Sequence, residues 1–235
     1  MVHYNYVGSE LDLFSVAVNW KSYLRRQVAP YYGPDVLEVG AGIGGTTSVF
    51  HDDSVNRWVC LEPDPALAET FAASVRAGSL PAACEVVVGL IDDLPQGELF
   101  DTILYIDVLE HIEDDRAEMV RAAGRLKPGG HVVVLSPAHQ FLFTPFDSSI
   151  GHYRRYSKST LRAAAPPELT EVRLSYLDAA GMLLSLGNRL VLKQSMPTSK
   201  QISFWDRCVV PISRMVDPLL AHKVGKSVLG VWRKP

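Results

Sequence analysis

The amino-acid sequence predicts an α/β fold built on a mostly parallel sheet with helices on both faces. Apolar runs of strand length alternate with amphipathic helical patterns as far as residue 135, as expected when helices connect parallel strands. The composition is that of a globular protein, with 47% hydrophobic and 21% charged residues and a formal net charge of −3. This charge argues against broad nucleic-acid binding, which needs basic faces to neutralise phosphates.

The elements follow in a regular order along residues 11–135. The first helix is predicted from Leu11 to Tyr32, because apolar residues recur there at steps of three and four, and Gly33-Pro34 ends it. Five strands are predicted at Val36–Val39, Trp58–Leu61, Glu85–Val88, Thr102–Ile106 and Val132–Leu135. The helices between them lie near Thr46–Phe50, Pro65–Ala77 and Asp115–Leu126.

The pattern changes after Ser136. Residues 137–157 are rich in loop-forming residues, and Ser157 can cap a short helix that ends before Pro166-Pro167. The remaining elements are a strand at Glu171–Tyr176, helices at Ala179–Leu192 and Phe204–Leu220 around a connection at Met196–Ser199, and a strand at Val228–Trp232. We see no linker, so residues 1–235 are predicted to form a single domain.

A glycine-rich turn after the first strand is the strongest functional signal. Residues 36–45 read VLEVGAGIGG, in which a buried strand runs directly into glycines that let a ligand lie against the backbone. Gly40, Gly42 and Gly45 also satisfy the pattern of dinucleotide-binding folds, and Glu62 has the spacing of the acidic ribose partner. The turn alone therefore leaves the nucleotide open.

Four motifs in order resemble those of class I S-adenosylmethionine (SAM)-dependent methyltransferases, particularly the small-molecule enzymes of the type 11 group in bacteria. They are EVGAGIG at 38–44, CLEPD at 60–64, YIDVLEH at 105–111 and RLKPGG at 125–130. The resemblance covers about residues 35–140 well and the rest more loosely. It implies a Rossmann-like, seven-stranded, mostly parallel sheet with an antiparallel last strand. It also implies SAM as cofactor and S-adenosylhomocysteine (SAH) as product.

The same resemblance implies which residues contact the cofactor. Glu62 would accept both ribose hydroxyls, the turn at 89–90 would lie beside the adenine with Asp92 or Asp93 near it, and residues 107–109 would line the pocket below the reacting methyl. The predicted cofactor-binding residues are Glu38, Gly40, Ala41, Gly42, Gly44, Glu62, Pro63, Gly89, Leu90, Asp107, Val108 and Leu109.

The acceptor side is predicted from two further clusters. The stretch GHYRRY at 151–156 resembles one in many bacterial small-molecule methyltransferases, and it follows the fifth strand at the sheet edge where open α/β sheets bind ligands. His152, Arg154 and His111 are the catalytic candidates, since imidazole can act as a base and arginine can orient an anionic acceptor, including a peptide C-terminus. The substrate-binding candidates are Arg155, Tyr156 and Trp20.

The spacing of Asp107, Glu110 and His111 leaves another possibility open. These side chains would share one face of a helical turn and could ligate a divalent metal, as a similar run in ubiquinone-pathway O-methyltransferases suggests. Because such runs are common in SAM-binding domains generally, we predict no metal. By the resemblance, residues 1–34 would cap the SAM pocket, and residues 137–225 would form the acceptor-side loop and helical insertion.

The predicted function is methyl transfer to an oxygen (hydroxyl or carboxylate) or nitrogen of a small molecule or peptide in bacterial metabolism, as part of biosynthesis. The alternatives are a nicotinamide-dependent oxidoreductase and a non-catalytic SAM-fold binding protein. Three scattered cysteines, the lack of a signal-peptide pattern and the lack of a membrane-spanning run predict a cytoplasmic protein. We expect a monomer or a homodimer that binds no nucleic acid.

Overall fold

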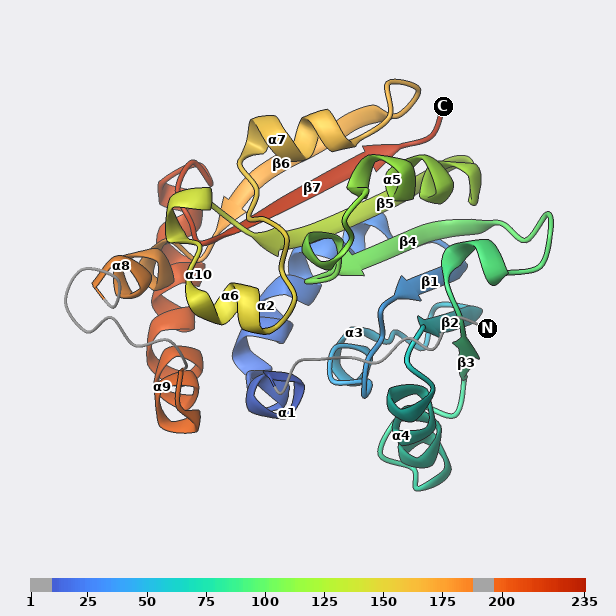
Figure 1. Ribbon diagram of the computed structural model, residues 1–235, viewed down its shortest axis with the longest axis horizontal. Helices are drawn as coiled ribbons and strands as arrows, with labels where there is room; N and C mark the ends of the chain where they lie inside the picture. Colours follow the sequence, from blue (N-terminus) through green and yellow to red (C-terminus); the bar gives the residue numbers. More distant parts are fainter. Residues whose placement is uncertain (1–9, 188–196) are drawn as a thin grey trace.

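The computed structural model describes residues 10–187 and 197–235, and it contains the predicted seven-stranded sheet (Figure 1). The strand order is β3-β2-β1-β4-β5-β7-β6, and β7 runs antiparallel to both β5 and β6 while the other described pairs are parallel. The strands are β1 (Asp35–Val39), β2 (Arg57–Glu62), β3 (Cys84–Val88), β4 (Phe100–Ile106), β5 (Leu126–Pro137), β6 (Thr170–Leu177) and β7 (Ser227–Arg233). The predicted fold class, including the antiparallel last strand, is confirmed.

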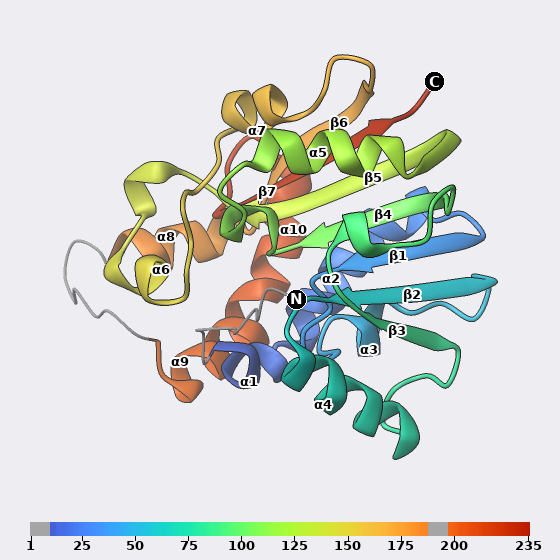
Figure 2. The same cartoon turned by 45° about the vertical axis from the view of Figure 1, so that its right-hand side comes forward.

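Helices cover both faces of this sheet (Figure 1 and Figure 2). Buried side chains of α2, α3, α4 and α10 belong to the core on one face, whereas those of α5 and α7 belong to the core on the other. The helices are α1 (Glu10–Ser15), α2 (Val18–Val28), α3 (Thr47–Phe50), α4 (Pro65–Arg76), α5 (Asp115–Gly124), α6 (Pro145–Ser149), α7 (Lys158–Ala164), α8 (Ala179–Gly187), α9 (Ser199–Phe204) and α10 (Val210–Leu219).

The first predicted helix is broken, which corrects the continuous helix expected from Leu11 to Tyr32. α1 ends at Ser15 and α2 begins at Val18. The carboxylate of Asp206, from a π-helical turn at Trp205–Val209, accepts the backbone N–H groups of Asn19 (3.2 Å) and Trp20 (2.8 Å). These are donors that the first turn of a helix leaves without partners, so a side chain 186 residues away provides the helix start.

Two boundaries in the C-terminal half also differ from the prediction. Helical structure before α10 begins at Ser199 rather than Phe204, because Thr198 caps α9 by accepting the N–H of Gln201. The predicted loop at 137–157 contains α6, which Pro145 starts and which the capping pair Thr144 and Asp147 stabilises. Part of the predicted helix at Ala179–Leu192, residues 188–192, and Met196 lie outside the described residues. No helix among the described residues is long and apolar enough to cross a membrane.

Candidate active site

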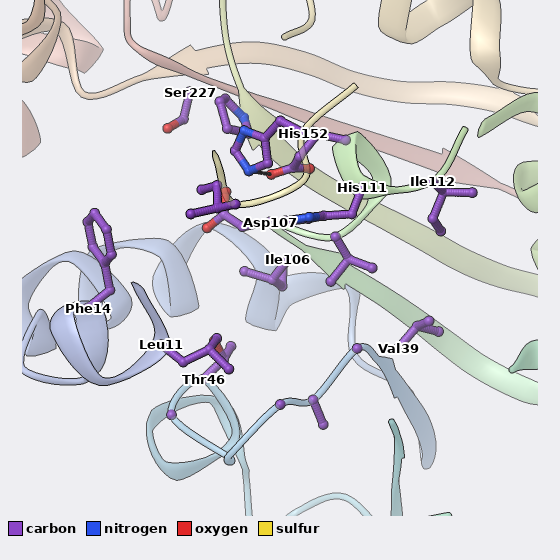
Figure 3. A pocket seen from close by; sticks show the side chains of 18 of the residues that line it. Leu11, Phe14, Val39, Thr46, Ile106, Asp107, His111, Ile112, His152 and Ser227 are labelled. Carbon is purple, nitrogen blue, oxygen red and sulfur yellow. Dashed lines mark ion pairs between the residues drawn. The ribbon is translucent and has the colours of Figure 1, made fainter. Parts of the chain in front are cut away.

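A cavity of about 520 Å³ lies at the carboxyl ends of β1, β2 and β4, within the size range of small-molecule sites. Residues of the helical insertion and of α1 and α2 complete its walls. In Figure 3, Asp107, His111 and His152 gather on one wall, and Leu11 and Phe14 of α1 lie on another. The position agrees with the general rule that open α/β sheets bind ligands beyond the carboxyl ends of their strands.

The glycine turn forms one wall of the cavity and requires glycine for steric reasons. Gly40 and Gly42 have φ values of 69° and 56°, in the left-handed region that favours glycine. A Cβ on Gly40 would lie 2.6 Å from Cγ2 of Val108, so the turn packs directly against the segment after β4. Gly44 does not line the cavity, and a Cβ there would lie 2.4 Å from Leu80.

Glu62 joins the end of β2 to the glycine turn. One carboxylate oxygen accepts the N–H of Gly42 at 2.8 Å, and the other accepts the N–H of Asp64 at 2.9 Å. Burial raises the pKa of Glu62, while these two backbone hydrogen bonds oppose the rise. The side chain lines the cavity, and each carboxylate oxygen can accept a further hydrogen bond, as a pair of ribose hydroxyls requires.

The turn at 89–90, which was predicted to lie beside the adenine, also lines the cavity. Pro63, Gly89 and Leu90 line the cavity, and the backbone of Gly89 donates to the carbonyl of Glu62 at 3.1 Å. Asp93 accepts the N–H of Leu90 at 2.8 Å, so it shapes this turn. Together with the glycine turn and Glu62, this wall fits the nucleoside of SAM. The backbone of Gly40 and Gly42, which carry no side chains, and the carboxylate of Glu62 at the end of β2 face the same cavity.

Asp107 faces the cavity at the end of β4 in a strained backbone conformation. Its φ is 55°, which is uncommon for a residue other than glycine and costs about 1–3 kcal/mol. The backbone N–H of Asp107 donates to Leu135 at 2.9 Å, which holds the turn at this position. Partial desolvation by the surrounding protein raises the pKa of Asp107, although the residue is exposed to the cavity and His152 and Lys226 oppose the rise.

Glu110, His111 and His152 form a cluster beside Asp107. Their nitrogen and oxygen ligand atoms lie within 4.8 Å of one another, and the two imidazole rings meet edge to face with centroids 4.5 Å apart. Burial, together with the charge of Asp107, raises the pKa of Glu110 well above its usual value. Burial and the neighbouring His152 lower the pKa of His111 to about 4. The cluster has donor atoms suited to a divalent metal, but its third member is His152 rather than Asp107, which the spacing in the sequence had suggested as a possibility.

Asp147 orients His152. Nδ1 of His152 lies 3.0 Å from Oδ1 of Asp147, and Arg155 grips both oxygens of the same carboxylate at 2.7 and 2.9 Å. Burial would raise the pKa of Asp147, but the hydrogen bonds from His152 and Arg155 outweigh it and hold the pKa well below its usual range. Since the ionised carboxylate can only accept, Nδ1 carries the proton, and Nε2 of a neutral His152 is left as an acceptor.

Most of the predicted site residues meet in this one cavity. Its walls include Gly40, Ala41, Gly42, Glu62, Pro63, Gly89, Leu90, Asp107, Val108, His111, His152, Arg155 and Trp20. The predicted residues that do not line it are Glu38, Gly44, Leu109, Arg154 and Tyr156.

Three of these five residues have partners that explain their position. Arg154 pairs with Asp115 at 2.7 Å and donates to the carbonyl of Glu113, so its guanidinium points away from the cavity. The hydroxyl of the buried Tyr156 donates to the same Asp115 at 2.7 Å. Glu38 lies beneath the glycine turn and accepts hydrogen bonds from Thr47 and Trp58.

Two lysines in the cavity wall were not predicted as site residues, although Lys21 belongs to the segment 1–34 that was expected to cap the pocket. Lys226 precedes β7, lies 3.7 Å from the ring centre of Trp205 and pairs with Asp178 at 3.4 Å. Lys21 of α2 also lines the cavity. Neither residue lies in a motif: Lys226 reaches the cavity because β7 pairs with β5, and Lys21 lies beside the glycine turn, where a Cβ on Gly45 would lie 3.2 Å from its Nζ. The sequence suggested Glu110 only as a possible metal ligand. No pattern in the sequence indicated that its side chain would be buried in the cavity wall.

Comparisons with known proteins agree with this geometry. Residues 37–134 match the family model of the Methyltransferase domain. Ajmaline N-methyltransferase from Rauvolfia serpentina is 27% identical over 205 residues, which are 84% of this chain and 62% of that protein, so the chain spans less than two thirds of this relative.

Solved structures share the fold at lower identity. N-methyltransferase NodS from Bradyrhizobium japonicum WM9, in complex with SAH, superposes with a TM-score of 0.60 at 17% identity, over 98% of this chain and 93% of that one. Coclaurine N-methyltransferase bound to N-methylheliamine and SAH gives a TM-score of 0.63 at 14% identity, over 99% and 76%. Over residues 37–134 the chain therefore matches a methyltransferase domain, and its sheet order and glycine–Glu62 wall agree with the predicted resemblance to class I SAM-dependent methyltransferases.

Proposed function

We propose that this chain transfers a methyl group from SAM to a hydroxyl or amine of a small molecule or peptide, with His152 as the general base. The observation that carries this proposal is the Asp147–His152 pair in the cavity wall. Asp147 holds the proton on Nδ1, which leaves Nε2 to accept a proton from the acceptor. A general base of this kind contributes about 10²–10⁴ in rate.

The part of the cavity wall formed by the glycine turn, Glu62 and the turn after β3 would hold the cofactor. The turn at 40–42 would lie against it, Glu62 would accept the ribose hydroxyls, and residues 89–91 would flank the base. When bound, SAM supplies a methyl group on a sulfonium, an electrophile with a neutral leaving group. The protein then has to align the acceptor and exclude water, which can lower a barrier by about 7–11 kcal/mol.

The charges around His152 favour a hydroxyl or amine over a carboxylate as the acceptor. Both arginines of the 151–156 stretch are already paired with carboxylates, Arg155 with Asp147 and Arg154 with Asp115. Asp107 and Glu110 lie on the acceptor side, and the Glu110 oxygens have no hydrogen-bond donor at good geometry among the described residues. An acceptor with a donor hydrogen can bind the oxygens of Glu110 and Asp107, whereas an ionised carboxylate has no hydrogen to donate to them. Ajmaline N-methyltransferase, by its name, is an enzyme with a nitrogen acceptor.

The test compares matched acceptors and matched histidine variants. An amine, an alcohol and a carboxylate that carry the same apolar group are supplied with SAM, and SAH formation is measured. We expect turnover of the amine or the alcohol, a loss of about 100-fold or more in His152→Gln, and unchanged SAM affinity. His131→Gln, in the middle of β5 and paired with Thr102 near the start of β4, is the control, because His131 does not line the cavity. Equal turnover of the carboxylate by wild type and His152→Gln would contradict the proposal, as would an SAH complex whose sulfur points away from His152.

A further inference from the structure

The charge of this chain is divided unevenly along the sequence. Residues 179–235 contain nine Lys and Arg but only two Asp, a formal net charge of +7, although the whole chain carries −3. The first 178 residues therefore carry −10. The basic part contains α8, α9 and α10, which form one end of the molecule (Figure 1 and Figure 2).

Both acidic residues of the basic part face inward. Asp206 is 3% exposed and accepts the backbone of α2, and Asp217 is fully buried and accepts the N–H groups of Asp178 and Ala179. The exposed charged residues between 197 and 224 are all basic: Lys200, Arg207, Arg214 and Lys223. None of the four forms an ion pair with a described acidic side chain.

Large apolar side chains lie exposed among these charges. Ile212, Met215 and Leu219 recur at steps of three and four on α10 and are 52%, 73% and 84% exposed, and Phe204 at the end of α9 is 56% exposed. The opposite side of α10 is buried through Val210, Ser213 and Asp217. We call Phe204, Ile212, Met215 and Leu219, with Lys200, Arg207 and Arg214, the outer face.

We propose that the outer face binds the surface of an anionic lipid bilayer. An amphipathic helix with apolar residues on one side and basic residues beside them lies in the membrane interface, with its apolar side chains among the lipid chains and its cations at the headgroups. Such a helix lies on the membrane without crossing it, in keeping with the absence of a membrane-spanning helix among the described residues.

Charge complementarity favours this occupant over a second copy of the chain. A twofold dimer through the outer face would bring two sets of the same basic side chains together, with every described acid of this segment buried. An anionic bilayer instead places negative headgroups beside the basic side chains of the outer face and lipid chains around its apolar side chains. Trp205 and Ser185, from the same end of the molecule, line the cavity, so a membrane-bound enzyme would hold its acceptor side close to the lipid.

The experiment is cosedimentation of the full chain with phosphatidylcholine vesicles and with vesicles of equal parts phosphatidylcholine and phosphatidylglycerol. We expect binding to the anionic vesicles that weakens with added salt, and little binding to the neutral ones. Arg207→Glu/Arg214→Glu should weaken binding at least about 25-fold, because each basic side chain near an anionic surface contributes a factor of about five. Met215→Ser/Leu219→Ser should also weaken it.

The matched control is Arg76→Glu/Arg116→Glu, which makes the same change in net charge at exposed sites of α4 and α5. It should keep most of the vesicle binding. Failure of the wild type to bind anionic vesicles, or an equal loss in the control, would overturn the proposal. So would a homodimer in solution that Met215→Ser/Leu219→Ser dissociates. SAM affinity, measured in every variant, stays unchanged if the outer face acts separately from the cofactor site, so this test and that of methyl transfer can fail independently.

Discussion

Glu62 contributes to the site through hydrogen bonds to the backbone on both sides of the cofactor wall. Its carboxylate accepts the N–H groups of Gly42 and Asp64, so it shapes the glycine turn, and we propose that it also accepts the ribose hydroxyls. Each charge-assisted hydrogen bond that is lost costs about 1.5–3 kcal/mol. We expect Glu62→Ala to lower SAM affinity at least about tenfold in isothermal titration. Glu85→Ala, an exposed residue of β3, is the control. Unchanged affinity in folded Glu62→Ala would show that the ribose is held elsewhere.

Glu38 gives the protein a predictable dependence on pH. Burial raises the pKa of Glu38 to about 7, although hydrogen bonds from Trp58 and Thr47 oppose the rise. The folded state therefore holds this proton more tightly than the unfolded state, whose glutamate pKa is about 4.3. The stabilisation from Glu38 is complete below pH 4.3 and is lost as the pH rises through about 7.

Glu38→Gln removes this titration but keeps an oxygen for Trp58 and Thr47. We expect the free energy of unfolding of the wild type to fall relative to that of Glu38→Gln between about pH 5 and pH 8, as measured by urea denaturation. For Glu69→Gln, at an exposed position of α4, the free energy of unfolding should change with pH in parallel with that of the wild type. Parallel curves for Glu38→Gln would mean that Glu38 is ionised throughout.

At the scale of an element, two adjacent arginines in the loop between β5 and α7 have different partners and different roles. Arg155 is a positioning residue that clamps Asp147, which in turn holds His152, whereas Arg154 ties the loop to Asp115 outside the cavity. Arg155→Leu should destabilise the protein by about 3–5 kcal/mol, since it leaves a buried carboxylate with one fewer partner. Arg154→Leu should cost less, because its side chain is more exposed.

The two variants should also differ in a signal from His152. NMR should show that the Nδ1 proton of His152 loses its protection from exchange in Arg155→Leu but keeps it in Arg154→Leu. Turnover should also fall further in Arg155→Leu than in Arg154→Leu. Equal effects of the two substitutions would mean that the loop acts only as a scaffold and that the clamp does not orient His152.

At the scale of the whole molecule, cofactor binding should stabilise the fold selectively. A ligand at 100 times its Kd that binds only the folded state adds about 2.7 kcal/mol, which for a chain of this size raises the Tm by about 5–10 °C. We expect this shift with SAH but not with NAD, measured by calorimetry at equal ligand concentrations. Glu62→Ala should show a smaller shift with SAH. A shift with NAD alone would contradict the assignment of the cofactor.

The amino-acid sequence by itself determined the alternation of strands and helices through β5 and the meeting of the glycine turn with Glu62 at one sheet edge. Each of β1 to β5 is rich in apolar residues, and the predicted bounds of each overlap the observed strand. The glycine turn follows directly after β1, Glu62 is the last residue of β2, and parallel strands end at the same edge of a sheet. Local pattern and sheet geometry were therefore sufficient to bring Gly40, Gly42 and Glu62 together.

Only the tertiary structure decided the acceptor side and the break in the first helix. The adjacent residues Arg154 and Arg155 look equivalent in the sequence, and their roles differ because Asp115 and Asp147 reach them from different directions. Asp206 starts α2, and Lys226 reaches the cavity, through contacts between segments far apart in the chain. Such contacts depend on how the helical insertion packs against the sheet, and no local spacing encodes that packing.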